Sequence, residues 1–503
     1  MEKYVEKIKK YNFMFIGTMI LGLLAHLFML TNKLPNHDDI ESLFSKGVTN
    51  ELGRWGLELI QYILPNFSMP WLNGIILLIC IAVSACIIAE ILKIKSKVKQ
   101  ILIGGIMITY ASVTCTLAYM FTASAYGIAI LLAVLSVYFA IKNKKINIFF
   151  SIICLTLSIS IYQAYISLAI TLFVILLIQD CLNENKDIKQ ILKKLGKFAL
   201  ISISSLVIYL IIMIIVNKIA NVSLSNYQGA SELGNISIIS ILKGIINSYA
   251  VLPRMILRDL YGISAGIILK ACYLITISLT IIFALIHLIK IVKINKKKAI
   301  IYAFLGVILP ITMNLMYIIN PNVEMHSLIL YSNCLLPIIP IILIEKLDKS
   351  KLKDITNKIL VVTLSIIIFK YIIYANECYL QMELSYENTH SFYTTLVTRI
   401  EQTEGFNSDT KIAFIGSYSG AMIQNNGMYF SDLEDFTGIF SNVELINAYS
   451  KKNFIKYYIG VNFKYETDER VEELENMEEV KEMNVYPYDG SIKKIENTIV
   501  VKF

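Results

Sequence analysis

Long apolar runs that recur along the first three quarters of the chain constrain its fold more than any other feature. Each run spans about twenty residues, the length at which an α-helix crosses a hydrocarbon core roughly 30 Å thick. A backbone in lipid must satisfy its own hydrogen bonds, so such runs cross as helices. The 503 residues are 56% hydrophobic and only 17% charged, as expected for a helical membrane protein.

About eleven of these runs are predicted as transmembrane helices. Two alternatives stand for the stretch 146–181: two helices joined by a tight outer turn at 162–165, or one long tilted helix. With the first alternative, the predicted spans are 12–31, 71–92, 100–118, 124–141, 146–161, 166–181, 197–217, 264–289, 299–319, 327–345 and 359–376.

Lysines separate the connections between these runs into two alternating sets. The positive-inside rule places the lysine-rich set in the cytoplasm. Because the net charge of +8 is gathered in these short loops, it indicates a membrane anchor and no nucleic acid partner. An odd number of spans then puts the N-terminus of this multi-pass cell membrane protein in the cytoplasm and its C-terminal part outside. The lysine-rich connections are 1–10, 93–99, 142–145, 183–197, 290–298 and 346–358.

Residues 1–376 form the predicted transmembrane domain. Two outer segments within it, 32–70 and 218–263, mix charged and apolar residues at helical spacing. Such segments are predicted as amphipathic helices that lie along the outer membrane surface.

Residues 377–503 have the composition of a small soluble domain. A long helix is predicted over 377–403, a buried strand over 411–416, a charged helical stretch over 466–483 and a closing strand over 498–503. The predicted fold class is therefore an all-α polytopic membrane domain followed by a small extracytoplasmic α/β domain.

Arginine is rare, and its placement is uneven. Only five of the 46 basic residues are arginines, and all five fall in predicted outer segments. A guanidinium binds phosphate or carboxylate through paired hydrogen bonds, whereas lysine suffices for bulk positive charge. The alternative is that each arginine pairs with a nearby acid, as Arg258 would with Asp259. The five are Arg54, Arg254, Arg258, Arg399 and Arg470.

Two adjacent carboxylates, Asp38 and Asp39, follow the first predicted span. Burying both at the membrane edge without partners is costly, so a cleft that holds a metal, a sugar hydroxyl or a cation explains them. One of them is the candidate general base that takes a proton from an acceptor hydroxyl. Both are the candidate ligands if the site takes a divalent metal, and no other cofactor is predicted. The alternative is that one of them is the N-cap of the next helix.

Three further polar residues, Tyr162, Gln163 and His326, lie at predicted span ends. Tyrosines are common there as interface anchors, and a lone histidine beside a span is more often structural than a ligand. The sequence contains no phosphate-binding glycine loop, nucleotide fingerprint or HExxH motif. An enzyme facing outward would therefore receive its activated substrate attached to lipid.

The acidic pair at 38–39, Gly-Arg-Trp at 53–55 and Tyr-Gln at 162–163 together resemble the bacterial glucosyltransferase II family. That family is typified by serotype-converting O-antigen glucosyltransferases. Its members look like C-type glycosyltransferases, which are multispan enzymes with an acidic residue in the first outer loop. Such enzymes take a sugar from a polyprenyl-phosphate carrier on the outer leaflet. The resemblance covers roughly the first 350 residues.

The resemblance implies that Asp38 or Asp39 is the catalytic base, and that Arg54 binds the lipid phosphate or the sugar. It also implies transfer of a hexose, by preference glucose, to a cell-surface glycan or glycopolymer. Where the family has an arginine near the start of a late span, this chain has Met325-His326. The residues predicted to bind substrate or phosphate are Arg54, Trp55, Tyr162, Gln163, Arg254, Arg258 and His326.

Two other functions are compatible with a multispan chain. A transporter or flippase of lipid-linked saccharides would need charged groups at mid-membrane depth and repeat-related broken helices, whereas these spans are almost free of charge at their centres. A non-catalytic envelope assembly protein would instead act through its outer domain, and replacement of Asp38, Asp39 and Arg54 would leave it functional.

Overall fold

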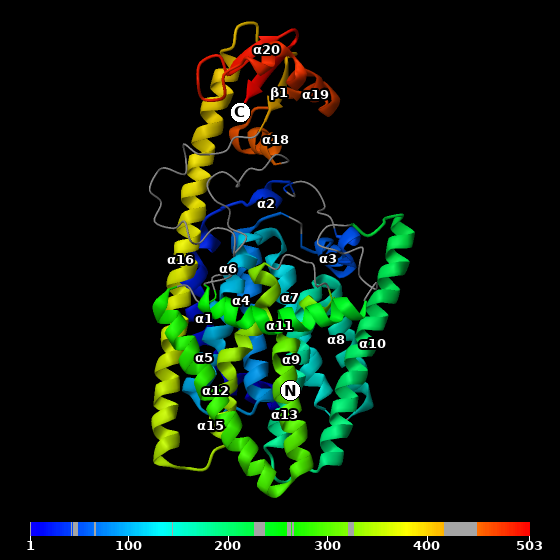
Figure 1. The fold of residues 1–503 in the computed structure, drawn as a ribbon, viewed down its shortest axis with the longest axis vertical. Helices are drawn as coiled ribbons and strands as arrows, with labels where there is room; N and C mark the ends of the chain where they lie inside the picture. Colours follow the sequence, from blue (N-terminus) through cyan, green and yellow to red (C-terminus); the bar gives the residue numbers. More distant parts are fainter. Residues whose placement is uncertain are drawn as a thin grey trace. The chain divides into compact units, whose positions relative to one another are not determined.

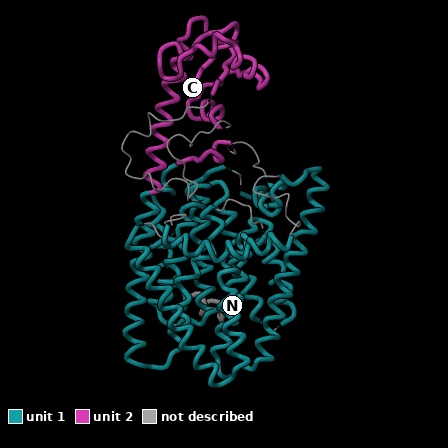
Figure 2. Tube along the Cα trace, viewed as in Figure 1, with its two compact units in different colours: residues 1–33, 46–377, 436–438 teal, residues 34–45, 378–435, 439–503 magenta. Residues whose placement is uncertain are grey.

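The computed structural model divides into two compact units, which Figure 2 shows in different colours. The first comprises residues 1–33, 46–377 and 436–438, and the second comprises 34–45, 378–435 and 439–503. Side chains are described from residue 10 onward. The structure describes residues 2–41, 43, 49–64, 67–142, 144–225, 237–258, 263, 266–319, 326–416 and 450–503.

Helices joined by short turns make up the first unit over its described residues (Figure 1). The helix α16 runs through the boundary between the two units, which falls after Glu377. In chain order the elements are α1 (Glu2–Thr31), η1 (Asn50–Leu52), α3 (Trp55–Gln61), α4 (Pro70–Ile91), α5 (Lys97–Thr109), α6 (Ala111–Ala118), α7 (Met120–Ala140), α8 (Lys145–Ile161), η2 (Gln163–Tyr165), α9 (Ile166–Cys181), α10 (Ile188–Ala220), α11 (Ile238–Leu257), α12 (Ile267–Ile294), α13 (Lys296–Met313), α14 (Met316–Ile319), η5 (Ser327–Ile338), α15 (Ile339–Glu345) and α16 (Lys351–Glu401).

Nine helical segments in the described part of the chain are long and apolar enough to cross a membrane. They coincide with nine of the predicted spans, so the chain is a multi-pass membrane protein. The two remaining predictions fall on α8, an apolar helix of 17 residues, and on α13, which opens with three lysines. The total of eleven crossings therefore stays a prediction.

The outer faces of the long helices are themselves apolar. In the most apolar stretch of α10 only 22% of the residues are buried inside the protein, and in that of α12 only 28%. Ile203 and Ile214 of α10 and Ile267 of α12 are all more than half exposed. An apolar surface of this extent marks contact with lipid in a membrane protein.

The stretch 146–181 forms two helices, which excludes the single tilted helix. α8 ends at Ile161, and Tyr162 is extended, with φ −153° and ψ 112°. The short turn η2 then leads directly into α9, as predicted for a tight turn at 162–165. A similar break at Tyr110, with φ −55° and ψ 140°, separates α5 from α6.

The segment 218–263 contains the predicted amphipathic helix. Figure 1 shows α11 lying crosswise to α10 and α12. Its inner side is tied to the break between α13 and α14, since Ser248 Oγ donates to the Asn314 carbonyl at 3.1 Å and Asn314 Nδ2 donates back to the Ser248 carbonyl at 3.3 Å. Its other side exposes apolar residues such as Ile239 and Ile246. Its place on the outer membrane surface stays a prediction.

The second unit is built on a four-stranded sheet of order β2-β1-β4-β3. β1 runs parallel to β2 and β4, and β3 is antiparallel to β4. The strands predicted at 411–416 and 498–503 and the charged helical stretch are confirmed. The elements, besides the end of α16, are α2 (His37–Glu41), β1 (Lys411–Ile415), α18 (Lys451–Phe454), η8 (Ile455–Ile459), β2 (Lys464–Tyr465), α19 (Asp468–Asn476), α20 (Glu478–Lys481), β3 (Ile492–Ile495) and β4 (Thr498–Lys502).

Alternating strand residues bury both faces of this sheet. Ile412 and Phe414 pack with Leu396 of α16, whereas Ala413 and Ile415 pack with Leu474 of α19. This is the period of two expected for a strand that is covered on both sides. The unit therefore has a core of its own.

A partly buried carboxylate, that of Glu466, ties the strands β1 and β4 to the residue after β2. Glu466 accepts hydrogen bonds from Lys411 Nζ at 3.0 Å and from Thr498 Oγ1 at 2.7 Å. Burial acts to raise the pKa of Glu466, but these two hydrogen bonds, together with the positive charges of Lys411 and Arg470, hold the pKa below its usual value. The carboxylate thus stabilises the sheet in its ionised form.

Candidate functional site

A tight turn before α3 presents Arg54 and Trp55. Gly53 has φ +69°, in the left-handed region that glycine adopts most readily. Two backbone hydrogen bonds close the turn: Gly53 N donates to the Asn50 carbonyl and Arg54 N to the Thr49 carbonyl, both at 2.9 Å. The conformation of Gly53 therefore sets the direction in which Arg54 leaves the backbone.

Two side chains from distant helices hold this turn from outside. Gln163 Nε2 donates to the Leu52 carbonyl at 2.8 Å and lies 3.1 Å from the Tyr209 hydroxyl. The Tyr209 hydroxyl donates to the Gly53 carbonyl at 3.0 Å. We call Gln163 and Tyr209 the carbonyl clamp, because together they satisfy two consecutive carbonyls of the turn.

The guanidinium of Arg54 lies against a pair of tyrosines. Its central carbon is 4.9 Å from the centroid of the Tyr162 ring, and Nη1 lies 3.4 Å from the Tyr126 hydroxyl. The two rings stack with centroids 4.4 Å apart and planes 23° apart. The guanidinium carbon therefore lies over the face of an aromatic ring, and the planar fork of a guanidinium suits an oxyanion.

Trp55 is the next residue and opens α3. Its side chain is only 7% exposed. The indole Nε1 is buried and has no hydrogen-bond partner among the residues that the structure describes. A buried indole N–H usually finds an acceptor, so this donor is suited to a substrate oxygen.

The acidic pair lies in the second unit, and the structure separates the roles of its two members. Asn36 is the N-cap of α2: its Oδ1 accepts from Asp39 N at 2.9 Å, and Asp39 Oδ2 accepts from Asn36 N at 3.2 Å. This reciprocal arrangement is a capping box. Asp39 is 2% exposed, whereas the Asp38 side chain is 43% exposed with Oδ1 3.4 Å from His37 Nε2. Asp39 thus stabilises the helix, and neither aspartate is the N-cap itself.

The rest of α2 is anchored in the second unit as well. Ile40 is fully buried in the core formed with α16 and the sheet. Glu41 accepts a hydrogen bond from Asn453 Nδ2 at 3.0 Å. Burial raises the pKa of Glu41; the bond from Asn453 opposes this shift, and the nearby charge of Asp38 adds to it. The helix therefore holds Asp38 on a fixed support.

Three other residues, Arg254, Arg258 and His326, were also predicted to bind substrate or phosphate. Arg254 and Arg258 lie at the C-terminal end of α11 and are exposed. The proposed partner Asp259 lies outside the described residues. His326 precedes η5 and is partly buried, and its carbonyl accepts from Ile329 N at 3.0 Å. No group of three His, Cys, Asp or Glu side chains with metal-ligand geometry occurs among the described residues.

Two residues of this arrangement were not predicted from the sequence. Tyr126 and Tyr209 lie in the apolar helices α7 and α10. Their signal was a hydroxyl within an apolar run, because a polar group at such a place needs a partner in the fold. Of the predicted residues, the structure brings Arg54, Tyr162 and Gln163 together in the first unit.

The family model described as Glucosyl transferase GtrII matches residues 27–336, more than half of the chain. The chain belongs to this family. All nine predicted site residues fall within the GtrII match, and residues 377–503 fall outside it. No curated protein and no solved structure matches the chain. GtrII membership and the apolar helices together make the protein a membrane glycosyltransferase.

Proposed function

We propose that this protein transfers a hexose, glucose by preference, from a polyprenyl-phosphate-linked donor to a surface glycan or glycopolymer. The transfer takes place on the extracytoplasmic side of the cell membrane. GtrII membership supports the transfer of a sugar, and a chain made largely of apolar helices suits a donor carried by lipid. The observation that carries the proposal is the guanidinium of Arg54, which lies over the Tyr162 ring and follows a turn that the carbonyl clamp holds.

Arg54 binds the donor phosphate in this proposal. A polyprenyl phosphate leaves with its negative charge on oxygen, and a fixed guanidinium stabilises that charge as it develops. The contacts with Tyr162 and Tyr126 already restrict the guanidinium, so less side-chain freedom is lost when the phosphate binds. Trp55 Nε1 supplies a further donor to a substrate oxygen.

Asp38 is the proposed general base, because Asp39 is occupied by the capping box. The Asp38 carboxylate takes the proton of the acceptor hydroxyl while the hydroxyl oxygen forms a bond to the anomeric carbon. The bond from the anomeric carbon to the phosphate oxygen breaks, and the lipid phosphate leaves with the electron pair. Direct displacement of this kind inverts the anomeric centre.

The test compares Asp38→Asn with Asp39→Asn in the full chain, reconstituted in membranes with polyprenyl-phosphate glucose and a surface glycan acceptor. Loss of a general base costs about 10²- to 10⁴-fold in kcat, which we expect of Asp38→Asn only. Asp39→Asn weakens the capping box and lowers stability by about 1 kcal/mol, with most transfer retained. Full transfer by a well-expressed Asp38→Asn variant rejects Asp38 as the base.

A further inference from the structure

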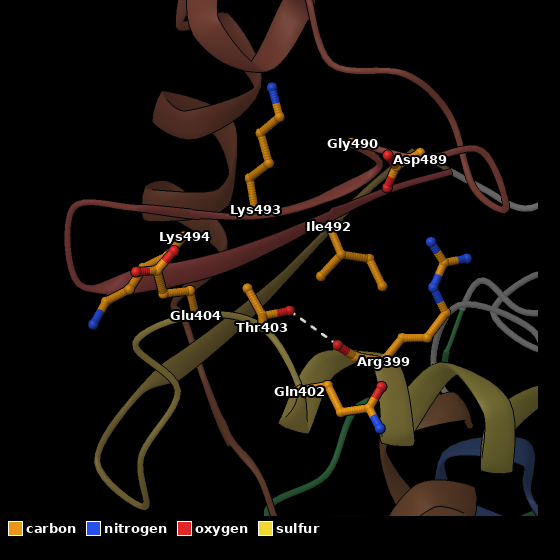
Figure 3. Close-up of a pocket in the computed structure, with 9 residues that line it drawn as sticks. All are labelled: Arg399, Gln402, Thr403, Glu404, Asp489, Gly490, Ile492, Lys493 and Lys494. Carbon is orange, nitrogen blue, oxygen red and sulfur yellow. Dashed lines mark hydrogen bonds between the residues drawn. The ribbon is translucent and has the colours of Figure 1, made fainter.

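An open pocket of about 570 Å³ in the second unit has no part in the roles assigned so far. One wall is the last turn of α16 and the residues after it, with Arg399, Gln402 and Glu404. The opposite wall is β3 and the turn before it, with Asp489 and Lys493 (Figure 3). Both walls belong to the same compact unit, and all their residues lie outside the GtrII match.

Two contacts join the walls of the pocket before any ligand binds. Arg399 Nη1 donates to the Pro487 carbonyl at 2.8 Å, and its guanidinium carbon lies 5.3 Å from the centroid of the Tyr486 ring. On the other side, Lys494 Nζ donates to the Gly405 carbonyl at 2.7 Å. Each contact joins the α16 wall to the β3 wall. A ligand that binds between them therefore meets groups already held in place.

The lining is polar almost throughout. Among the side chains that form it, Ile492 is the single apolar one, and Arg399, Lys493 and Lys494 outnumber the carboxylates Glu404 and Asp489. Pockets for acyl chains and most small molecules are lined mainly by apolar groups, so this lining does not suit a lipid tail. Carboxylates and amides placed beside cations instead match sugar hydroxyls, which both donate and accept hydrogen bonds.

We propose that this pocket binds an acidic oligosaccharide segment of the acceptor glycan. The cationic groups of Arg399 and Lys493 point apart (Figure 3), so two uronic acid residues of the segment supply the carboxylates, one to Arg399 and one to Lys493, and neighbouring hydroxyls donate to Glu404 and Asp489. Arg399 suits a carboxylate because its fork offers paired N–H groups in one plane. The role of the ligand as acceptor rests on the proposed function, whereas the binding itself does not.

The test measures binding by calorimetry to the full chain in lipid nanodiscs, with no sugar donor present. The probes are an oligogalacturonate hexamer, the neutral maltohexaose and inorganic phosphate. Lys493→Gln removes an exposed cation of the pocket, and Lys456→Gln removes an exposed cation of η8 that does not line it. We expect the hexamer to bind the parent chain, about tenfold more weakly to Lys493→Gln, and unchanged to Lys456→Gln.

Three results would overturn the inference: no binding of the hexamer to the parent chain, equal binding of maltohexaose, or equal binding by Lys493→Gln and the parent. Competition by inorganic phosphate at the same concentration as the hexamer would show a simple anion site and would also overturn it. Because no donor is present, each of these results leaves the transfer activity untouched. Full transfer by Asp38→Asn together with intact hexamer binding would reject the proposed base and leave this inference standing, so the two proposals can fail separately.

Discussion

Replacing Gly53 by alanine tests whether the turn before α3 positions Arg54. A Cβ on Gly53 would lie 2.7 Å from the Tyr209 hydroxyl, 2.8 Å from Met213 Sδ and 3.4 Å from Gln163 Nε2. The φ of +69° is also strained for any residue with a side chain. Alanine therefore collides with the carbonyl clamp and disfavours the backbone conformation that the clamp holds.

The size of the effect follows from two costs. Left-handed geometry costs a residue with a Cβ about 1–2 kcal/mol. Displacing the two hydrogen bonds that Gln163 and Tyr209 make to the turn costs about 1 kcal/mol each. Together these costs amount to about 3–4 kcal/mol, and if they are felt at the transition state they lower kcat/KM for sugar transfer by about 150- to 1000-fold.

The assay is transfer from polyprenyl-phosphate glucose in reconstituted membranes, with Gly196→Ala as the matched control. Gly196 lies in α10 with nothing within 4 Å of its added Cβ, so that variant should keep the parent rate. Combining Gly53→Ala with Tyr209→Phe removes the nearest colliding oxygen, and the double variant should lose less than the two single losses combined. Parent-level transfer by Gly53→Ala, or strict additivity in the double variant, would refute the positioning argument.

Two further predictions concern single hydrogen-bonding groups. Tyr209→Phe leaves the Gly53 carbonyl without its donor, and we expect kcat/KM to fall about tenfold with the fold intact, measured beside thermal unfolding of the same sample. Glu466 has its folded pKa below the usual 4.5, so its stabilisation is complete above about pH 4.5 and is lost as pH falls through the folded value. Hydrogen exchange of β1 and β4 should therefore accelerate on acidification in the parent chain and change less in Glu466→Gln.

Much of the fold was accessible from the sequence, because helix length and strand alternation are local properties. The turn at 162–165 and the strand at 411–416 were predicted from runs of a few residues. The continuity of α16 was not predicted. The last predicted span and the predicted helix over 377–403 form one helix of 51 residues. Its sequence contains neither glycine nor proline, so nothing in it breaks the helix where the composition changes.

The candidate site was only partly accessible, because its contacts join residues far apart in sequence. Gln163 was predicted to line the site, yet its amide holds a carbonyl 111 positions away, and Tyr209 meets Gly53 across 156 positions. No local pattern encodes such pairs. The capping box is the opposite case: Asn36 and Asp39 stand at the spacing of that motif, and the structural role of Asp39 follows from it.

The contact between Arg54 and Tyr162 yields a prediction that separates the ring from the hydroxyl. Tyr162→Phe keeps an aromatic face 4.9 Å from the guanidinium carbon, whereas Tyr162→Leu removes it. A partly desolvated cation–π contact contributes about 1–2 kcal/mol, so Tyr162→Leu should raise the KM for the donor about 5- to 30-fold while Tyr162→Phe stays near the parent value. If the two variants bind the donor equally well, the contact with the Tyr162 ring does not hold Arg54 for the phosphate, and the guanidinium must be positioned by the turn, the carbonyl clamp and the Tyr126 hydroxyl.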